Sequence, residues 1–162
     1  MGTQAQFSKG KIHDVVVKAL GKYLDERGWL AELFRSDEID SSYLPAMAYI
    51  SMTRPGIARG PHEHREQADC FAFIGPSNFK VYLWDARDDS PTRGVKQVIY
   101  AGGDSPVMVI VPPGVVHAYK NIGGEDGIVF NAPNKLYAGE GKHSPVDEIR
   151  HEEETGSPFL LD

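Results

Sequence analysis

Short apolar runs of strand length recur along the chain from residue 46 onward. They are separated by segments rich in glycine, proline, asparagine and aspartate, including 75–78, 102–104 and 123–126. Runs punctuated in this way are typical of strands. Many short strands with turns between them predict an all-β sandwich or barrel. The strands are expected at 46–51, 57–60, 68–74, 79–84, 95–101, 107–111, 115–119 and 127–131.

The segment before residue 46 has a less regular pattern. Three consecutive valines at 15–17 favour a strand over 12–20, because β-branched side chains fit a pleated surface better than a helix. We expect a turn at 25–28, a second strand at 29–34, and then a polar loop or one short helical turn at 36–42.

Both ends of the chain are polar. Residues 1–10 are expected to be frayed. The tail, 142–162, is acidic until the apolar segment 158–161, which we expect to dock on the body or on a partner. Since there is no internal repeat and no long helical period, we predict one domain over residues 1–162, with its core at about 12–139.

Composition narrows the function classes. Hydrophobic residues make up 41% and charged residues 25%, which is ordinary for a globular protein. The net charge of −6 and the lack of a basic run disfavour binding to nucleic acid or an anionic membrane. Cys70 is the single cysteine, which rules out an internal disulfide and fits a reducing compartment. Because neither a membrane-spanning apolar run nor a signal peptide is visible, the sequence predicts a cytoplasmic protein.

Candidate chemistry centres on three histidines. His62 and His64 are two residues apart, so on a strand they point to the same face. Asp69 follows five residues later, and His117 comes after a Pro-Pro-Gly turn. Three imidazoles and a carboxylate in one cavity suit either a divalent metal or proton transfer. Glu66 could replace Asp69 as a ligand.

Simpler interpretations exist for each of these residues. His62 and His64 could be surface imidazoles on an edge strand, and His117 a core residue bonded to backbone. Asp69 shares strand parity with Phe71, and on an inward face it would need a partner because unpaired burial of a carboxylate is costly.

Other residues have no chemical companions in the sequence. Trp29 and Trp84 are expected in the core. His13, His143 and His151 are expected on the surface.

Two spaced motifs resemble those of cupins, which are jelly-roll barrels with a double-stranded β-helix fold. The first motif is matched in order by Gly56, His62, His64, Asp69 and Gly75. The second is matched by Pro112, Gly114, His117 and Asn121. The resemblance implies a jelly-roll cupin fold.

A narrower resemblance, over about 25–137, is to the dTDP-4-dehydrorhamnose 3,5-epimerase family. It is carried by the segments 25–32, 56–62 (Gly-Ile-Ala-Arg-Gly-Pro-His) and 85–94 (Asp-Ala-Arg-Asp-Asp-Ser-Pro-Thr-Arg-Gly), and by Tyr137-Ala138. The last of the longer segments is specific, since a generic cupin does not have it.

This second resemblance implies particular roles and a reaction. His62 matches the general base, Tyr137 the general acid and Arg59 a contact to the nucleotide diphosphate. Arg27, Glu32 and His117 are further expected substrate contacts. The implied activity is epimerisation or isomerisation of a nucleotide-linked (dTDP-type) 4-keto-6-deoxy sugar without a cofactor, in a homodimer.

The chain also departs from the family pattern, which leaves two alternatives open. The family usually has glutamine where this chain has His64, and a lysine that helps to stabilise the enolate falls at Asp69. One alternative is therefore a metal-dependent cupin, a dioxygenase or sugar isomerase, in which His62, His64, Asp69 and His117 bind Fe, Mn, Ni or Zn. The other is a non-catalytic sugar-binding cupin.

Overall fold

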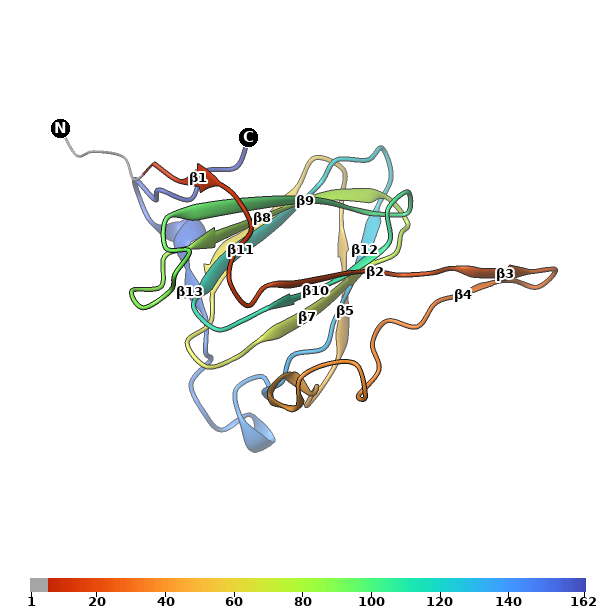
Figure 1. The fold of residues 1–162 in the computed structure, drawn as a ribbon, viewed down its shortest axis with the longest axis horizontal. Helices are drawn as coiled ribbons and strands as arrows, with labels where there is room; N and C mark the ends of the chain where they lie inside the picture. Colours follow the sequence, from red (N-terminus) through yellow and green to blue (C-terminus); the bar gives the residue numbers. More distant parts are fainter. Residues whose placement is uncertain (1–5) are drawn as a thin grey trace.

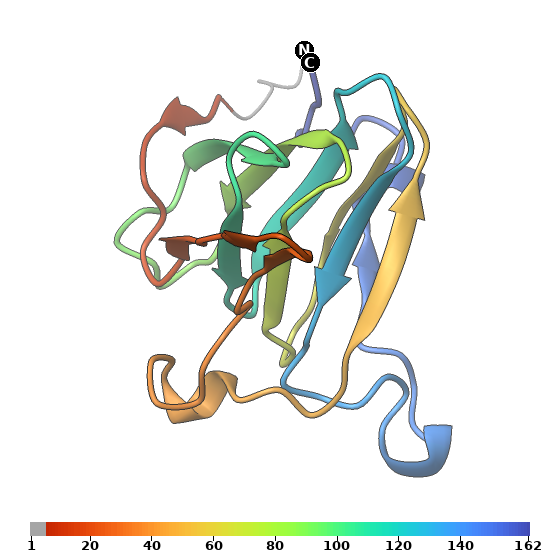
Figure 2. The same ribbon diagram turned by 90° about the vertical axis from the view of Figure 1, so that its right-hand side faces the viewer.

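The computed structural model describes residues 6–162, which form two facing β-sheets and a projecting hairpin (Figures 1 and 2). The six-stranded sheet has the order β1-β9-β8-β11-β6-β13, and the five-stranded sheet has the order β2-β10-β7-β12-β5. The strands of the first sheet are β1 (Ser8–Lys9), β6 (Ala58–Glu63), β8 (Asn78–Asp85), β9 (Val95–Gly102), β11 (Val115–Asn121) and β13 (Ile149–Arg150). Those of the second are β2 (Val16–Ala19), β5 (Tyr49–Thr53), β7 (Asp69–Phe73), β10 (Val107–Val111) and β12 (Gly127–Asn131). This two-sheet jelly roll confirms the predicted fold.

The remaining elements are short. The hairpin pairs β3 (Tyr23–Asp25) with β4 (Gly28–Leu30), and the turn between them lies where the sequence predicts one. Three 3-10 turns, η1 (Ser41–Tyr43), η2 (Glu140–Lys142) and η3 (His151–Glu153), lie in connecting segments. Within residues 6–162, no helical segment has the length and apolar character needed to cross a membrane.

The main core lies between the two sheets. It is built from alternate residues of the strands, because successive side chains of a strand point to opposite faces. The five-stranded sheet contributes Phe71 and Phe73 and the six-stranded sheet contributes Leu83 and Val115, all of which are buried. A second cluster on the outer face of the six-stranded sheet joins Trp84 to Phe159, so the apolar end of the tail docks on the body.

The Asp85–Thr92 segment, which carries part of the family resemblance, forms a hydrogen-bonded turn. The buried Asp85 carboxylate accepts hydrogen bonds from Arg87, Ser90 and Thr92. Burial alone would raise the pKa of Asp85, but these donors hold it below its ordinary value. The motif is therefore structural in this chain.

Four sequence predictions are wrong within the described residues. The segment 6–10, expected to be frayed, contains β1, which pairs with β9, and residues 1–5 lie outside the described part of the chain. Trp29 is 49% exposed because the hairpin projects away from the body, where Lys22 covers its ring (Figure 1). The predicted strand at 29–34 ends at Leu30. His151 is buried instead of exposed, since it packs on Phe159 and pairs with Glu63.

Candidate active site

The three histidines converge at one end of the sandwich, and we call them the histidine cluster. His62 lies on β6 directly opposite His117 on β11, and His64 follows the end of β6. The ring centroids of His62 and His117 are 4.5 Å apart, and His64 lies 5.7 Å from each. The three imidazoles therefore converge, as the sequence predicted from the i, i+2 spacing of His62 and His64 and from the later motif that contains His117.

A bulge in β6 sets the direction of His62. His117 pairs with His62 and Tyr119 pairs with Arg59, so Gly60 and Pro61 together oppose a single residue of β11. A bulge of this kind re-aims the side chains that follow it. Because of the extra residue, Arg59 and His62 both line the same cavity, although they are three positions apart.

Asp69 reaches the histidine cluster from the opposite sheet. Its Oδ2 atom lies 3.1 Å from His64 Nε2 and 3.1 Å from His117 Nε2, and its side chain is fully buried. Asp69 therefore lies on the inward face of β7, and its burial is offset by these imidazoles. Glu66, the alternative ligand, donates its backbone N–H to Asp147 and lines the larger cavity.

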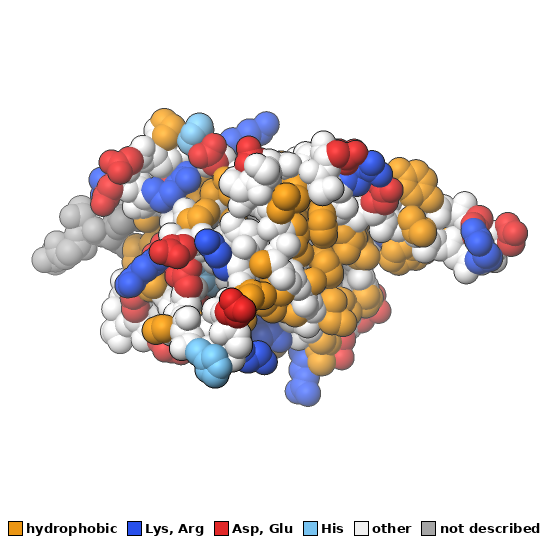
Figure 3. All heavy atoms as spheres, turned by 90° about the horizontal axis from the view of Figure 1, so that it is seen from below, with side chains coloured by type: hydrophobic (Ala, Val, Ile, Leu, Met, Phe, Trp, Pro, Cys, Tyr) orange, Lys and Arg blue, Asp and Glu red, His pale blue; other side chains and the backbone are white. Residues whose placement is uncertain are grey.

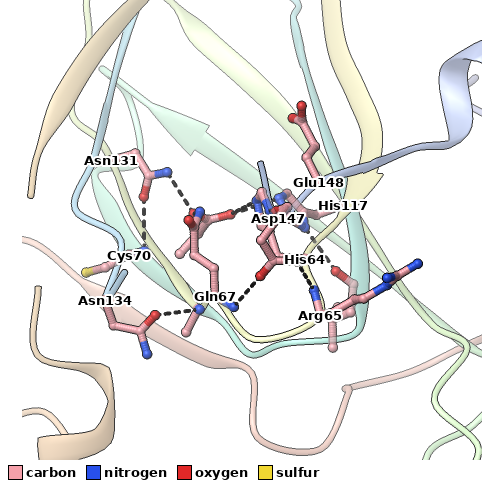
Figure 4. Close-up of polar contacts among 12 residues, drawn as sticks. His64, Arg65, Gln67, Cys70, His117, Asn131, Asn134, Asp147 and Glu148 are labelled. Carbon is pink, nitrogen blue, oxygen red and sulfur yellow. Dashed lines mark hydrogen bonds and ion pairs between the residues drawn. The ribbon is translucent and has the colours of Figure 1, made fainter. Parts of the chain in front are cut away.

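The remaining polar atoms around Asp69 are fixed by neighbours (Figure 4). Asp69 Oδ1 accepts from the side-chain amides of Gln67 and Asn131, both at 2.9 Å. Asn131 in turn donates to the hydroxyl of Tyr49 at 3.0 Å. The orientation of the carboxylate is therefore set by two neutral donors.

The other ring nitrogens of two histidines face backbone carbonyls. His117 Nδ1 lies 2.9 Å from the carbonyl of Val115, and His64 Nδ1 contacts the carbonyl of Asp147. The side chain of Asp147 accepts the backbone N–H groups of residues 65–67. This tail residue thus supports the turn that carries His64.

Electrostatics separates the roles of the imidazoles. Burial lowers the pKa of His62 to about 2, and the neighbouring His117 and His64 add to the effect, so its ring is neutral. Burial would also lower the pKa of His64, but the adjacent Asp69 carboxylate outweighs it and raises the value to about 9. Burial by itself would raise the pKa of Asp69, whereas the contacts with His117 and His64 hold it well below its usual range.

Two adjoining cavities reach the histidine cluster, at His62 and His64. The larger, about 660 Å³, is lined by Met47, Leu136 and Tyr137 among others, and the smaller, about 440 Å³, by Arg59, His62 and Tyr119 among others. Both volumes fall in the range of small-molecule sites. The two share the lining residues Tyr49, His64, Glu148 and Arg150. The two cavities therefore adjoin, with His64 lining both and His62 lining the smaller one, while His117 belongs to the lining of neither.

The predicted substrate residues are not all brought together. Arg59 lines the smaller cavity, where its guanidinium donates to Thr53 and to the carbonyl of Met52. Tyr137 is 56% exposed and lines the larger cavity, whereas His62 lines the smaller one. Arg27 lies at the exposed turn of the hairpin and pairs with Asp25, and Glu32 lies beside Arg35. Neither Arg27 nor Glu32 belongs to the lining of the two cavities, so their roles as substrate contacts stay predictions.

Sequence reasoning missed the tail as part of the site. β13 pairs with β6 and brings Glu148 and Arg150 to the rim of both cavities. Nothing in the sequence signals this, because a two-residue strand in a polar segment has no hydrophobic period. Tyr49 and Asn131 were both assigned to strands. The hydrogen bond between their side chains could not be predicted, because it depends on the register in which β5 pairs with β12.

Comparison with known proteins agrees with the resemblance seen in the sequence. The sequence profile of the dTDP-4-dehydrorhamnose 3,5-epimerase family matches residues 9–146. The Haloferax volcanii protein named "Probable low-salt glycan biosynthesis epimerase Agl13" is 39% identical over 127 residues, which cover 78% of this chain and 81% of that relative. The spore coat polysaccharide biosynthesis protein SpsL of Bacillus subtilis is 38% identical over 112 residues, covering 69% and 73%.

Solved structures share the fold at lower identity. A dTDP sugar isomerase from Desulfovibrio desulfuricans G20 superposes with a TM-score of 0.74 at 21% identity, covering 86% of this chain and 84% of that one. ChmJ, a 3'-monoepimerase from Streptomyces bikiniensis in complex with dTDP-quinovose, gives 0.73 at 18% identity, covering 88% and 74%. The chain therefore belongs to the dTDP-4-dehydrorhamnose 3,5-epimerase family and is an enzyme of the sugar-nucleotide epimerase and isomerase class.

Proposed function

We propose that the protein inverts a stereocentre next to the ketone of a dTDP-linked 4-keto-6-deoxy sugar, with His62 as the general base and Tyr137 as the general acid. The observation that carries this proposal is that the half-buried imidazole of His62 lines one of two adjoining cavities and the phenol of Tyr137 lines the other. The names of the relatives and of the solved structures support the substrate class.

The chemistry follows from the acidity of hydrogens next to a ketone. His62 accepts the proton from the ring carbon, and the electron pair left behind delocalises onto the ketone oxygen as an enolate. Tyr137 then gives its proton to the same carbon from the opposite face, while the electron pair returns from the oxygen. The result is an inverted centre, and this proton transfer needs no organic cofactor.

Arg59 is the proposed contact for the diphosphate. A guanidinium forms paired hydrogen bonds with phosphate oxygens, so it suits this ligand. In the free protein its donors are used by Thr53 and the backbone carbonyl of Met52, and its side chain lines the smaller cavity.

The test separates proton removal from proton return. In D₂O, with a dTDP-linked 4-keto-6-deoxy sugar, His62→Asn should lose deuterium incorporation at the sugar carbon by about 10²-fold or more. Tyr137→Phe should keep incorporation but lose the inverted product, because the base still works and the acid does not. NMR of the sugar reads both quantities.

The matched control is His143→Asn, which removes an exposed histidine outside both cavities. It should keep both activities, and circular dichroism should show that all variants are folded. Incorporation that persists in folded His62→Asn would sink the assignment of the base, and inversion that persists in Tyr137→Phe would sink that of the acid.

A further inference from the structure

The contact between Asp69 and His117 is short, but its direction does not satisfy either atom as a hydrogen bond would. The Asp69 Oδ2 atom is 3.1 Å from each Nε2, yet Oδ2 and His117 Nε2 are both buried and neither has a hydrogen-bond partner among the described residues. In a hydrogen bond, the oxygen lies along the N–H direction of the ring. A short contact away from that direction is expected when both atoms are directed at a common metal ion that lies beside the line between them.

The distances fit two ligands of one ion. Nitrogen and oxygen ligands lie about 2.1 Å from a first-row transition ion, so neighbouring ligands at about 90° are about 3.0 Å apart, and at a tetrahedral angle about 3.4 Å. The two observed separations of 3.1 Å fall between these values.

The outer nitrogens of the two rings are set for metal binding. Each Nδ1 faces a backbone carbonyl, of Val115 for His117 and of Asp147 for His64. An Nδ1–H that donates to a carbonyl leaves the Nε2 lone pair of a neutral ring directed at the carboxylate. Two such lone pairs and an anion repel one another unless a cation lies between them. In the free protein a proton on His64 fills that role, and a divalent ion would displace it.

The Asp69 carboxylate is also oriented so that one of its oxygens can bind a metal. Its Oδ1 accepts from Gln67 and Asn131, so Oδ2 alone faces the rings. In metal sites, the polar atom of a ligand side chain that does not bind the metal is typically held by a hydrogen bond. These outer contacts fix the direction of each ligand.

We propose that His64, His117 and Asp69 bind a divalent first-row transition ion. Two imidazoles and one carboxylate form a ligand set that such ions accept, with positions left for small ligands. His62 offers a nitrogen within 4.8 Å of those of the other two histidines, but Asp69 makes its ion-pair contacts with His64 and His117 alone. His62 therefore stays outside the set, on the cavity side.

This site would deepen the proposed function, on which that part of the inference rests. The Asp69 carboxylate lies beside the base, and an anion there opposes the negative charge that develops on the ketone oxygen. A divalent ion on this ligand set leaves a net positive charge at the floor of the cavities. His64, one of its ligands, lines both of them.

The test measures binding directly, with the full chain made without a histidine tag. Protein stripped with a chelator should bind one Co(II), Mn(II), Zn(II) or anaerobic Fe(II) per chain in calorimetry, with a visible spectrum for Co(II). His64→Ala and the near-isosteric Asp69→Asn should each weaken binding by at least the roughly 100-fold that losses of outer contacts reach. His62→Asn and the control His143→Ala should bind as the unchanged protein does.

Three outcomes would overturn the site. They are no binding of any of these ions, undiminished binding in both His64→Ala and Asp69→Asn, and loss of binding in His62→Asn. If His64→Ala does not fold, Asp69→Asn decides. Failure of the proposed function appears separately, as deuterium incorporation that persists in His62→Asn while the ion is still bound.

Discussion

Gly60 determines how the base is presented. Its φ is +86°, and a Cβ atom at this position would lie 2.5 Å from the carbonyl oxygen of His117. Only glycine combines this backbone conformation with so close an approach of two strands. The bulge that turns His62 toward the cavity therefore depends on a residue with no chemistry of its own.

Gly60→Ala should destabilise the fold and reduce activity. A positive φ costs an alanine about 1–2 kcal/mol, and overpacking against the His117 backbone adds about 1–3 kcal/mol. Gly56→Ala is the matched control, since its φ is +75° and its Cβ would meet no atom within 4 Å. Urea unfolding should show a larger loss for Gly60→Ala. Equal losses in the two variants would contradict the role of the close approach.

Also at the residue scale, the sequence predicted those site residues that lie close together in the chain or within a known motif. His62 and His64 follow from strand parity, and Asp69 and His117 from motif order. Asp147 could not be found in this way. It lies 83 positions from His64 in the chain, and its contact depends on the fold of the tail.

At the scale of elements, strand prediction succeeded where one apolar run fills one strand. The strands at 107–111 and 127–131 match β10 and β12 end to end. β6 extends to Glu63, beyond its predicted end, because pairing with β11 and β13 continues past the last apolar residue. β13 has no signal of its own, since its two residues are ordered by the edge of β6.

The link between the tail and the turn at 65–67 should contribute measurably to stability. Asp147→Ala removes three acceptor contacts to backbone N–H groups, which should cost about 2–3 kcal/mol because bonds to a charged acceptor exceed neutral ones. Glu153→Ala is the control, an exposed tail acid that pairs with Arg150 at 3.6 Å and should change stability by less than about 1 kcal/mol. Equal unfolding midpoints for the two variants would show that the turn holds without Asp147.

At the scale of the whole molecule, large apolar side chains are exposed on β5 and on the projecting hairpin. Ile50 is 67% exposed and Met52 also points outward from β5, the edge strand of the five-stranded sheet. The projecting hairpin carries Leu24, which is 80% exposed, and a two-stranded hairpin alone is marginally stable in water. Viewed from below, apolar side chains gather between the body and this hairpin (Figure 3).

A second copy of the chain would cover this surface, and we expect a homodimer. Light scattering should give twice the chain mass of 17.9 kDa. Ile50→Glu should shift the protein toward the monomer, because burying an unpaired carboxylate at an interface is costly. Tyr100→Glu, which alters an exposed aromatic on β9 of the other sheet, should leave the dimer intact. If the unsubstituted protein is a monomer, or if the dimer survives Ile50→Glu, this face does not form the dimer interface. It would then contact something else, since exposed apolar surface of this kind usually marks a binding site.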